Sequence, residues 1–460
     1  MTYEAERGAL QLVLTGDALV QRPLAQYREP RFLALRDLLL SADAAVTTLE
    51  AVVTDGTESP GYVTGGIHMR VPPQILDELR WLGIRMVATA TNHGFDFGEA
   101  GIRAHVRHLE RSGLTYAGMG LTMADARRPR YLDTPAGRIA LISATTSGPP
   151  ALYGQHQWRD GAGRPGANMV RYTSHYEVDG ELFDALRRLR DEFGLTGARR
   201  PGYGERSLGL ALMPDTEDSF YLGDLHDRFQ YPAPAGYRIV RAGKCRRRLV
   251  PDAGDLAENL QQIADARRMA DWVVVSLHSH ESGATAGEPA EVATVFARSA
   301  IEAGADVFYG NGPNRIRGVE IYQNRPIIYN LGTFIHESHV VERIQQDNYR
   351  RAGLDPWAAT PADFHDNQYG REWAGEWDSR FDQPSAWQSA VLAIEFGGHE
   401  LRELRLHPVE LGYRKRRSQR GRPLLADGDA ARETLARFQK ACEPYGTKVV
   451  IDGDVGRIQA

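Results

Sequence analysis

The chain contains very little cysteine, because its 460 residues include only Cys245 and Cys442. Two cysteines cannot form a disulfide framework, and such sparse use is typical of proteins from reducing compartments. Long apolar runs are also missing, so no transmembrane helix is predicted. The first residues, Met1 to Arg7, are polar and do not show the pattern of a secretory signal. These absences predict a cytoplasmic protein without a membrane partner.

An excess of positive charge is missing as well. The formal net charge is −5, whereas a general nucleic-acid binder normally has a basic face. We therefore expect no nucleic-acid partner. The hydrophobic content of 42% and the charged content of 25% are ordinary for a soluble globular protein.

Strand and helix patterns alternate over the first 145 residues. The predicted strands are Leu10–Leu14, Ala44–Thr48, Met86–Ala90, Thr115–Gly118 and Arg138–Ser143. The predicted helices between them are Arg31–Ser41, Pro73–Leu82 and Glu99–Ser112. Alternation resumes with the helix Asp255–Ala270, the strand Trp272–Leu277, the helix Pro289–Ala303 and the strand Asp306–Tyr309. This order predicts an α/β protein with a parallel or mixed sheet and helices on both faces.

Two segments interrupt this alternation. Residues 147–255 show a weak pattern in which only Gly180–Phe193 is clearly helical. We interpret them as an insertion that caps the site, with a surface excursion lacking a catalytic role as the alternative. Residues 336–385 are interpreted as a second excursion near the site. The basic run Arg414 to Arg417 indicates a solvated loop rather than a partner-binding patch. The C-terminal part is predicted to form hairpins of Arg317–Tyr322 with Pro326–Asn330 and of Ala390–Phe396 with Glu400–Pro408, and a helix over Gly428–Tyr445.

Five polar segments directly follow apolar, strand-like runs. They are Leu14–Asp17, Thr48–Glu50, Thr91–His93, Leu277–Glu281 and Gly310–Asn314. Ligands of open α/β sheets bind outside the carboxyl ends of the strands. Five such ends carrying carboxylate, amide and imidazole groups predict a metal-assisted active site.

These segments resemble the motifs of the CapA family, named for capsule and poly-γ-glutamate synthesis, whose fold is that of the calcineurin-like metallophosphoesterases. The matching residues are Gly16-Asp17, Leu49-Glu50, Thr91-Asn92-His93 with Asp96-Phe97-Gly98, Ser276–Glu281, Gly304–Asp306, Gly310–Asn314 and Tyr329–Gly332. The resemblance covers most of residues 10–335. It implies a single CapA-like catalytic domain over residues 1–460, built from layered sheets flanked by helices.

The chain departs from the family pattern in its metal ligands. Family members usually carry histidines where this chain has Asn311 and Asn314, and the Asp-x-His of hydrolytic enzymes does not follow Asp17. Two-metal phosphoesterases need nitrogen-rich ligand sets. The ligands expected here are mainly oxygen donors, namely Asp17, Glu50, Asn92, His278, Asn311 and Asn314. Such a set suits one hard divalent ion, with Ca²⁺ favoured and Mg²⁺ or Mn²⁺ as alternatives.

Three histidines, His93, His278 and His280, are predicted to act as acids and bases, because imidazole titrates near neutral pH. Asp17 or Asp96 would orient an imidazole and stabilise its charged form. The alternatives are that Asp96 caps a loop, that His280 orients a neighbouring group, and that His93 and His278 are buried core histidines.

Two imidazole–carboxylate pairs beside a metal favour proton transfer over hydrolysis. The chain looks like the CapA-like peptide epimerases of ribosomal peptide biosynthesis, including that of lasso peptides. The resemblance thus implies inversion of a Cα centre in a precursor peptide by two-base chemistry. The alternatives are metal-dependent hydrolysis of a phosphoester or of a γ-glutamyl-type amide, and a non-catalytic binding module. The sequence leaves open the oligomeric state and the identity of the peptide.

Overall fold

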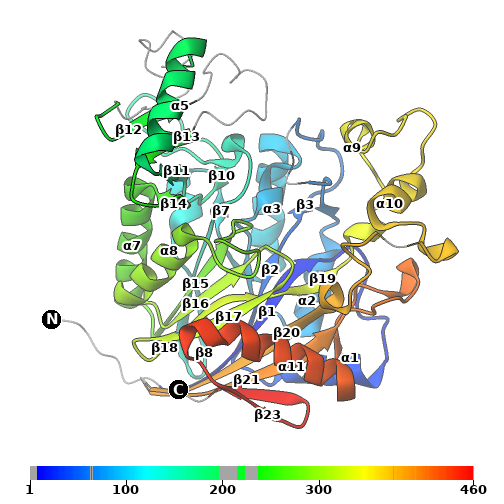
Figure 1. Ribbon diagram of the computed structural model, residues 1–460. Coiled ribbons are helices and arrows are strands. Elements are labelled where there is room, and N and C mark those ends of the chain that lie inside the picture. Colours follow the sequence, from blue (N-terminus) through cyan, green and yellow to red (C-terminus); the bar gives the residue numbers. More distant parts are fainter. Residues whose placement is uncertain are drawn as a thin grey trace.

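The structure is a computed structural model that describes residues 8–62, 64, 66–195, 215–222, 237–376, 378–398 and 400–458. Two large mixed sheets form its centre, and helices cover their outer faces (Figure 1). Of the predicted insertion, residues 196–214 and 223–236 lie outside the described residues.

The first sheet has ten strands, and the N-terminal strand β1 lies in its interior. Its strand order is β23 (Val449–Asp452), β24 (Val455–Ile458), β21 (Glu400–Glu410), β20 (Gln388–Gly397), β1 (Ala9–Leu19), β2 (Ala44–Leu49), β5 (Met86–Ala88) and β6 (Thr115–Ala117). In addition, β22 (Leu424–Leu425) pairs with β21, and β19 (Thr333–His336) pairs with β1. Strand β1 is parallel to β2 and β19 and antiparallel to β20. Residues from both ends of the chain therefore complete one sheet.

The second sheet has six strands. Their order is β17 (Ile316–Tyr322), β18 (Arg325–Leu331), β16 (Val307–Asn311), β15 (Trp272–His278), β9 (Gly137–Thr145) and β8 (Arg130–Thr134). Strand β15 is parallel to both of its neighbours, β9 and β16. The carboxyl ends of these three strands therefore lie at one edge of the sheet.

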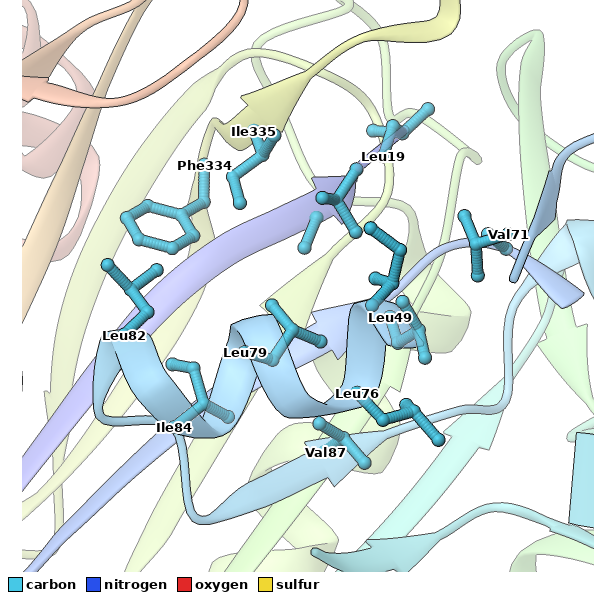
Figure 2. Packing of buried hydrophobic residues seen from close by; sticks show 14 of the residues in the cluster. Leu19, Leu49, Val71, Leu76, Leu79, Leu82, Ile84, Val87, Phe334 and Ile335 are labelled. Atoms are coloured by element: carbon cyan, nitrogen blue, oxygen red, sulfur yellow. The ribbon is translucent and has the colours of Figure 1, made fainter. Parts of the chain in front are cut away.

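Alternating side chains hold the layers together, as the two-residue period of a strand requires. Leu12 and Leu14 of β1 share one apolar cluster with Val274 of β15, so this cluster lies between the two sheets. Val13 belongs to a second cluster on the outer face, under α1 (Pro30–Leu40), α2 (Gln74–Leu82) and α3 (Gly98–Ser112). Figure 2 shows Leu76 and Leu79 of α2 in this outer cluster.

A third cluster packs α7 (Ala253–Arg267) and α8 (Glu291–Glu302) against the outer face of the second sheet. The result is four layers, helix, sheet, sheet and helix. The predicted α/β class, with layered sheets flanked by helices, is confirmed. Within the described ranges, no helix combines the length and apolar character needed to cross a bilayer.

The interrupting segments contain more regular structure than the sequence predicts. Residues 147–255 include α5 (Gly180–Phe193) and a four-stranded sheet of β12 (Ser219–Leu222), β13 (Tyr237–Arg241), β11 (Tyr172–Val178) and β14 (Arg246–Pro251). The predicted helix Gly180–Phe193 is confirmed, but the four strands were not predicted. The reason is visible in β11, whose side chains are half-buried on both faces and so show no apolar–polar alternation. Residues 336–385 include α9 (Gln346–Arg351) and α10 (Pro361–Tyr369); α5 and α9 rise on the same side of the two large sheets (Figure 1).

Strand β1 carries an irregularity where it enters the site. Its register with β2 shifts between Leu14 and Asp17, as in a β-bulge. A Cβ atom on Gly16 would lie 1.7 Å from the carbonyl oxygen of Gly332, so only glycine allows the two backbones to approach this closely. The irregularity brings Asp17 Oδ2 to the backbone N–H of Gly312, which donates to it over 2.8 Å.

We expect Gly16→Ala to destabilise the fold, because the added methyl group must displace backbone atoms rather than a flexible side chain. Overpacking of this kind costs about 1–3 kcal/mol or more. Gly161→Ala is the matched control, since a Cβ there meets no atom within 4 Å. Thermal unfolding followed by circular dichroism measures the difference. Equal melting temperatures for the two variants would contradict the close approach.

Candidate functional site

Eight predicted site residues lie where the carboxyl ends of the two sheets meet. Asp17 lies near the carboxyl end of β1, and Glu50 directly follows β2. His278 is the last residue of β15, and Asn311 is the last residue of β16. The short helix η1 (Asn92–Phe95) follows β5 and supplies further members of the group. The complete set is Asp17, Glu50, Asn92, His93, Asp96, His278, His280 and Asn311.

Four donors converge on one point of this group. His278 Nε2 lies 3.1 Å from His280 Nε2 and 2.9 Å from Asn92 Oδ1. Glu50 Oε1 lies 3.7 Å from the first of these nitrogens and 3.8 Å from the second. In the described part of the chain, Glu50, His278 and His280 are the one trio of acidic or imidazole groups close enough to share a metal ion. Imidazole nitrogens and carboxylate oxygens at such spacing suit a divalent cation.

The electrostatics of two buried carboxylates, Asp17 and Glu50, also favour a bound cation. Burial, together with the charge of Asp17, raises the pKa of Glu50 to about 7, although His278 and His93 act in the opposite direction. Glu50 Oε2 and Asp17 Oδ1 accept no hydrogen bond from the described residues. Because a buried ionised carboxylate is costly without a partner, a bound cation would stabilise both. The residues present therefore fit a divalent metal.

The amide of Asn311 contacts the metal centre through a histidine. Its Oδ1 lies 2.8 Å from His278 Nδ1, and its Nδ2 donates to Ser276 Oγ over 3.0 Å. An amide oxygen that accepts from Nδ1–H leaves Nε2 of the same ring unprotonated and able to bind a metal. Asp17 Oδ1 lies 3.4 Å from the same Nδ1.

Asn314 is the predicted ligand that the structure does not bring to the group. Its Oδ1 accepts a hydrogen bond of 2.8 Å from Thr333 Oγ1, and its backbone is left-handed, with φ of 50°. The spacing of the last motif therefore did not reveal which of its two asparagines reaches the centre.

His93 and Asp96 form a tight imidazole–carboxylate pair. His93 Nδ1 lies 2.6 Å from Asp96 Oδ2, and His93 Nε2 lies 3.8 Å from Glu50 Oε1. Burial alone would lower the pKa of His93, but the charge and hydrogen bond of Asp96 raise it above its ordinary value. Asp96 also accepts from Thr64 Oγ1 over 2.6 Å and from the backbone of Met69 over 2.7 Å. It thus both orients an imidazole and ties down the loop before β4 (Arg70–Val71).

The two remaining histidines differ in access. The side chain of His278 is fully buried, whereas that of His280 is 35% exposed. Burial lowers the pKa of His280. His280 was predicted as an acid or base, but its Nε2 faces the Nε2 of His278, as a second metal ligand would. Alternate residues of an extended chain lie on one face, so the His-x-His spacing could have indicated this pairing.

Glu281 is a site residue whose role the sequence did not reveal. Its carboxylate accepts hydrogen bonds of 2.5–3.1 Å from the hydroxyl groups of Thr146, Ser147, Ser279 and Tyr172. Ser147 Oγ in turn accepts from the backbone N–H of His280 over 2.8 Å. Burial would raise the pKa of Glu281, but these donors lower it. An ionised Glu281 therefore fixes the loop that carries His280, and Tyr172 connects this loop to β11 of the inserted sheet.

The fold and the site together define an α/β protein with a carboxylate–imidazole centre suited to a divalent metal. Residues 11–338 match the family of the bacterial capsule synthesis protein PGA_cap. Because the match spans more than half of the chain, the chain belongs to this family. The resemblance to the CapA family that the sequence motifs indicated is confirmed at this level.

Individual relatives differ widely in their similarity. Two uncharacterized proteins of Sinorhizobium fredii strain NGR234 are 32% identical over 455 residues, which is 97% of this chain and 92% of theirs. A probable polyglutamine synthesis accessory protein of Mycobacterium tuberculosis is 22% identical over 65% of this chain and 56% of its own length. The PGA biosynthesis protein CapA of Bacillus subtilis is 28% identical over 23% of this chain and 29% of its own length.

Among solved structures, NAD nucleotidase of Haemophilus influenzae aligns with a TM-score of 0.30 and 10% identity. The alignment covers 96% of this chain and 60% of the nucleotidase. A likeness at this level supports no inference about activity.

We expect Glu50→Gln and His280→Ala each to weaken divalent-metal binding by at least about 10-fold, because even a partner that only supports a ligand is worth 10–100-fold in affinity. His156→Ala is the control, since His156 is exposed and pairs with Glu258. Isothermal titration of metal-free protein with Ca²⁺, Mn²⁺ and Zn²⁺ measures the effect and ranks the ions. Unchanged affinities in both site variants would contradict the assigned centre.

Asp96→Asn is expected to lower the pKa of His93. The Asp96 carboxylate stabilises the imidazolium and so raises this pKa; a neutral amide stabilises it less, so the proton is lost at lower pH. NMR titration of ¹³C-labelled histidines follows the change, with the His93 signal identified by its loss in His93→Gln. Asp55→Asn, beside the more exposed His108, should leave the His93 titration unchanged. A His93 pKa that stays the same in Asp96→Asn would argue against the pair.

Proposed function

We propose that the chain is a metal-dependent peptide epimerase that inverts a Cα centre in a ribosomal, lasso-type precursor peptide. Membership of the PGA_cap family and the metal-suited centre indicate a metal-dependent enzyme; epimerisation is the further step. The observation that carries it is the His93–Asp96 pair, whose imidazole faces Glu50 of the centre. An imidazole held in this way suits the removal or return of a proton.

The residues of the centre would hold one ion. Glu50, His278 and His280 provide the donors, together with the Asn92 oxygen. A divalent ion, when bound, would stabilise the negative charge that develops on the carbonyl oxygen next to the reacting Cα. Asn311 keeps His278 in the orientation that leaves Nε2 available.

Inversion requires a proton transfer on each face of the Cα centre. Neutral His93 would accept the proton at Nε2, and Asp96 would stabilise the imidazolium that forms. The sequence left open which histidine serves which face of the Cα centre. The side chain of His278 is fully buried. His280 is more exposed and would make the second transfer only if its Nε2 is not a ligand of the ion. Its Nε2 cannot bind the ion and donate a proton at once, so the metal affinity of His280→Ala distinguishes the two roles.

Incubation in D₂O with candidate precursor peptides, followed by mass and chiral analysis, tests the proposal. Epimerisation predicts uptake of one deuteron at one residue, inversion of that residue and no cleavage. His93→Ala should reduce exchange by about 10²–10⁴-fold, the usual contribution of an acid–base group. His156→Ala should exchange at the wild-type rate. Full exchange by His93→Ala would rule out His93 as the base.

A metal-dependent hydrolase is the second candidate, and the donor set favours it. Two imidazole nitrogens 3.1 Å apart give the centre more nitrogen than the sequence indicated, and two imidazoles with one carboxylate also hold the catalytic ion of zinc peptidases. His93 would then protonate the leaving group. Release of phosphate from generic phosphoesters, or cleavage of a γ-glutamyl amide, would favour this reading. Metal binding without any of these activities would favour a non-catalytic binding module.

A further inference from the structure

A cavity of about 810 Å³ opens beside the basic run Arg414 to Arg417. Its remaining walls are Val340, Glu372, Gly375 and Ser418. No residue of the metal centre lines it. Ligand pockets in proteins are typically about 300–1,000 Å³, so the cavity is large enough for several residues of an extended peptide.

The basic loop has a fixed backbone. The backbone is left-handed at Gly412 and at Arg414, with φ of 82° and 57°. Residues other than glycine rarely adopt this conformation, so Arg414 is the unusual one. The backbone N–H of Lys415 donates to the carbonyl of Gly412 over 3.0 Å, and that of Gly421 donates to Leu411 over 2.8 Å. The loop therefore presents its side chains from one defined turn.

Only half of the positive charge of this loop is neutralised. Arg414 pairs with Asp382 and Arg417 with Asp366, each at 2.8 Å, and both carboxylates belong to the 336–385 excursion. Lys415 and Arg416 are exposed, and their side chains make no ion pair or hydrogen bond with the described residues. The two arginines thus attach the loop to the excursion, and two cations remain at the cavity.

We propose that this cavity binds an acidic segment of a polypeptide, with Lys415 and Arg416 pairing with two of its carboxylates, a role that the sequence alone did not favour for this basic run. The segment would belong to the precursor peptide, and to that extent the inference rests on the proposed function. A nucleic acid fits less well. Its continuous run of phosphates would need more than two unpaired cations, and the chain as a whole carries a charge of −5.

Fluorescence anisotropy with a labelled twelve-residue peptide of alternating Glu and Ala tests the inference. The wild type should bind it, and binding should weaken as salt is added, because exposed charges are screened. Lys415→Glu combined with Arg416→Glu should weaken binding at least tenfold. Arg437→Glu combined with Lys440→Glu is the matched control. It makes the same change of charge at two exposed residues of α11 (Gly428–Cys442) and should bind like the wild type.

The outcomes separate this inference from the catalytic proposal. Glu50→Gln should bind the acidic peptide normally, so a failure of epimerisation would leave the binding result intact. The inference is wrong if the wild type does not bind the peptide, or if the loop variant binds as tightly as the control. It is also wrong if single-stranded RNA of equal charge competes as well as the peptide does.

Discussion

Two carboxylates buried at one place form the constraint on which the site depends. Asp17 and Glu50 are buried together, and the charge of Asp17 makes ionisation of Glu50 more costly. The first sheet supplies both of them and cannot neutralise them alone. The second sheet supplies His278, the Asn311 amide and the Gly312 backbone N–H at the same edge. Neither sheet therefore contains a complete site.

Polar contacts between the sheets keep this edge in register. The apolar cluster between the sheets includes Tyr309 of β16, whose hydroxyl donates to the carbonyl of Thr15 and accepts from Thr48 Oγ1. Both partners lie within two residues of a site carboxylate, Thr15 before Asp17 and Thr48 before Glu50. The contacts of Tyr309 in the second sheet and the close backbone approach at Gly16 thus fix the positions of the two acidic groups.

The sequence predicted the main layers well, because their signals are local. Strands β2 and β15 begin with apolar runs and are buried along their whole length, and α2 and α3 end at Gly83 and Gly113, both left-handed. The inserted strands were missed because their half-buried side chains do not alternate. Strand β19 was missed too. Only Gly332 separates it from β18, so the two strands were not distinguished in the sequence.

The location of the site was predictable, but the roles within it were less so. The rule that parallel strands end at one edge brings Asp17, Glu50 and His278 together. It does not say which atom of each group faces which neighbour. Asn311 and Asn314 occur three residues apart in one motif, and only the turn between them decides that the first contacts His278. Glu281 lies in the predicted segment Leu277–Glu281, but its role was not predicted, because its hydroxyl partners are spread over three separate segments.

The interior position of β1 has a consequence for biosynthesis. One of its edges pairs with β2 soon after both are made, but the other waits for β20, which begins at residue 388. At a translation rate of about 5–20 residues per second, roughly 20–70 s pass before this second partner leaves the ribosome. During that time the unpaired backbone N–H and C=O groups along one edge of an apolar strand stay open to pairing with other nascent chains. Productive expression of this chain would then depend on chaperones or on a low growth temperature, even if the finished fold is stable.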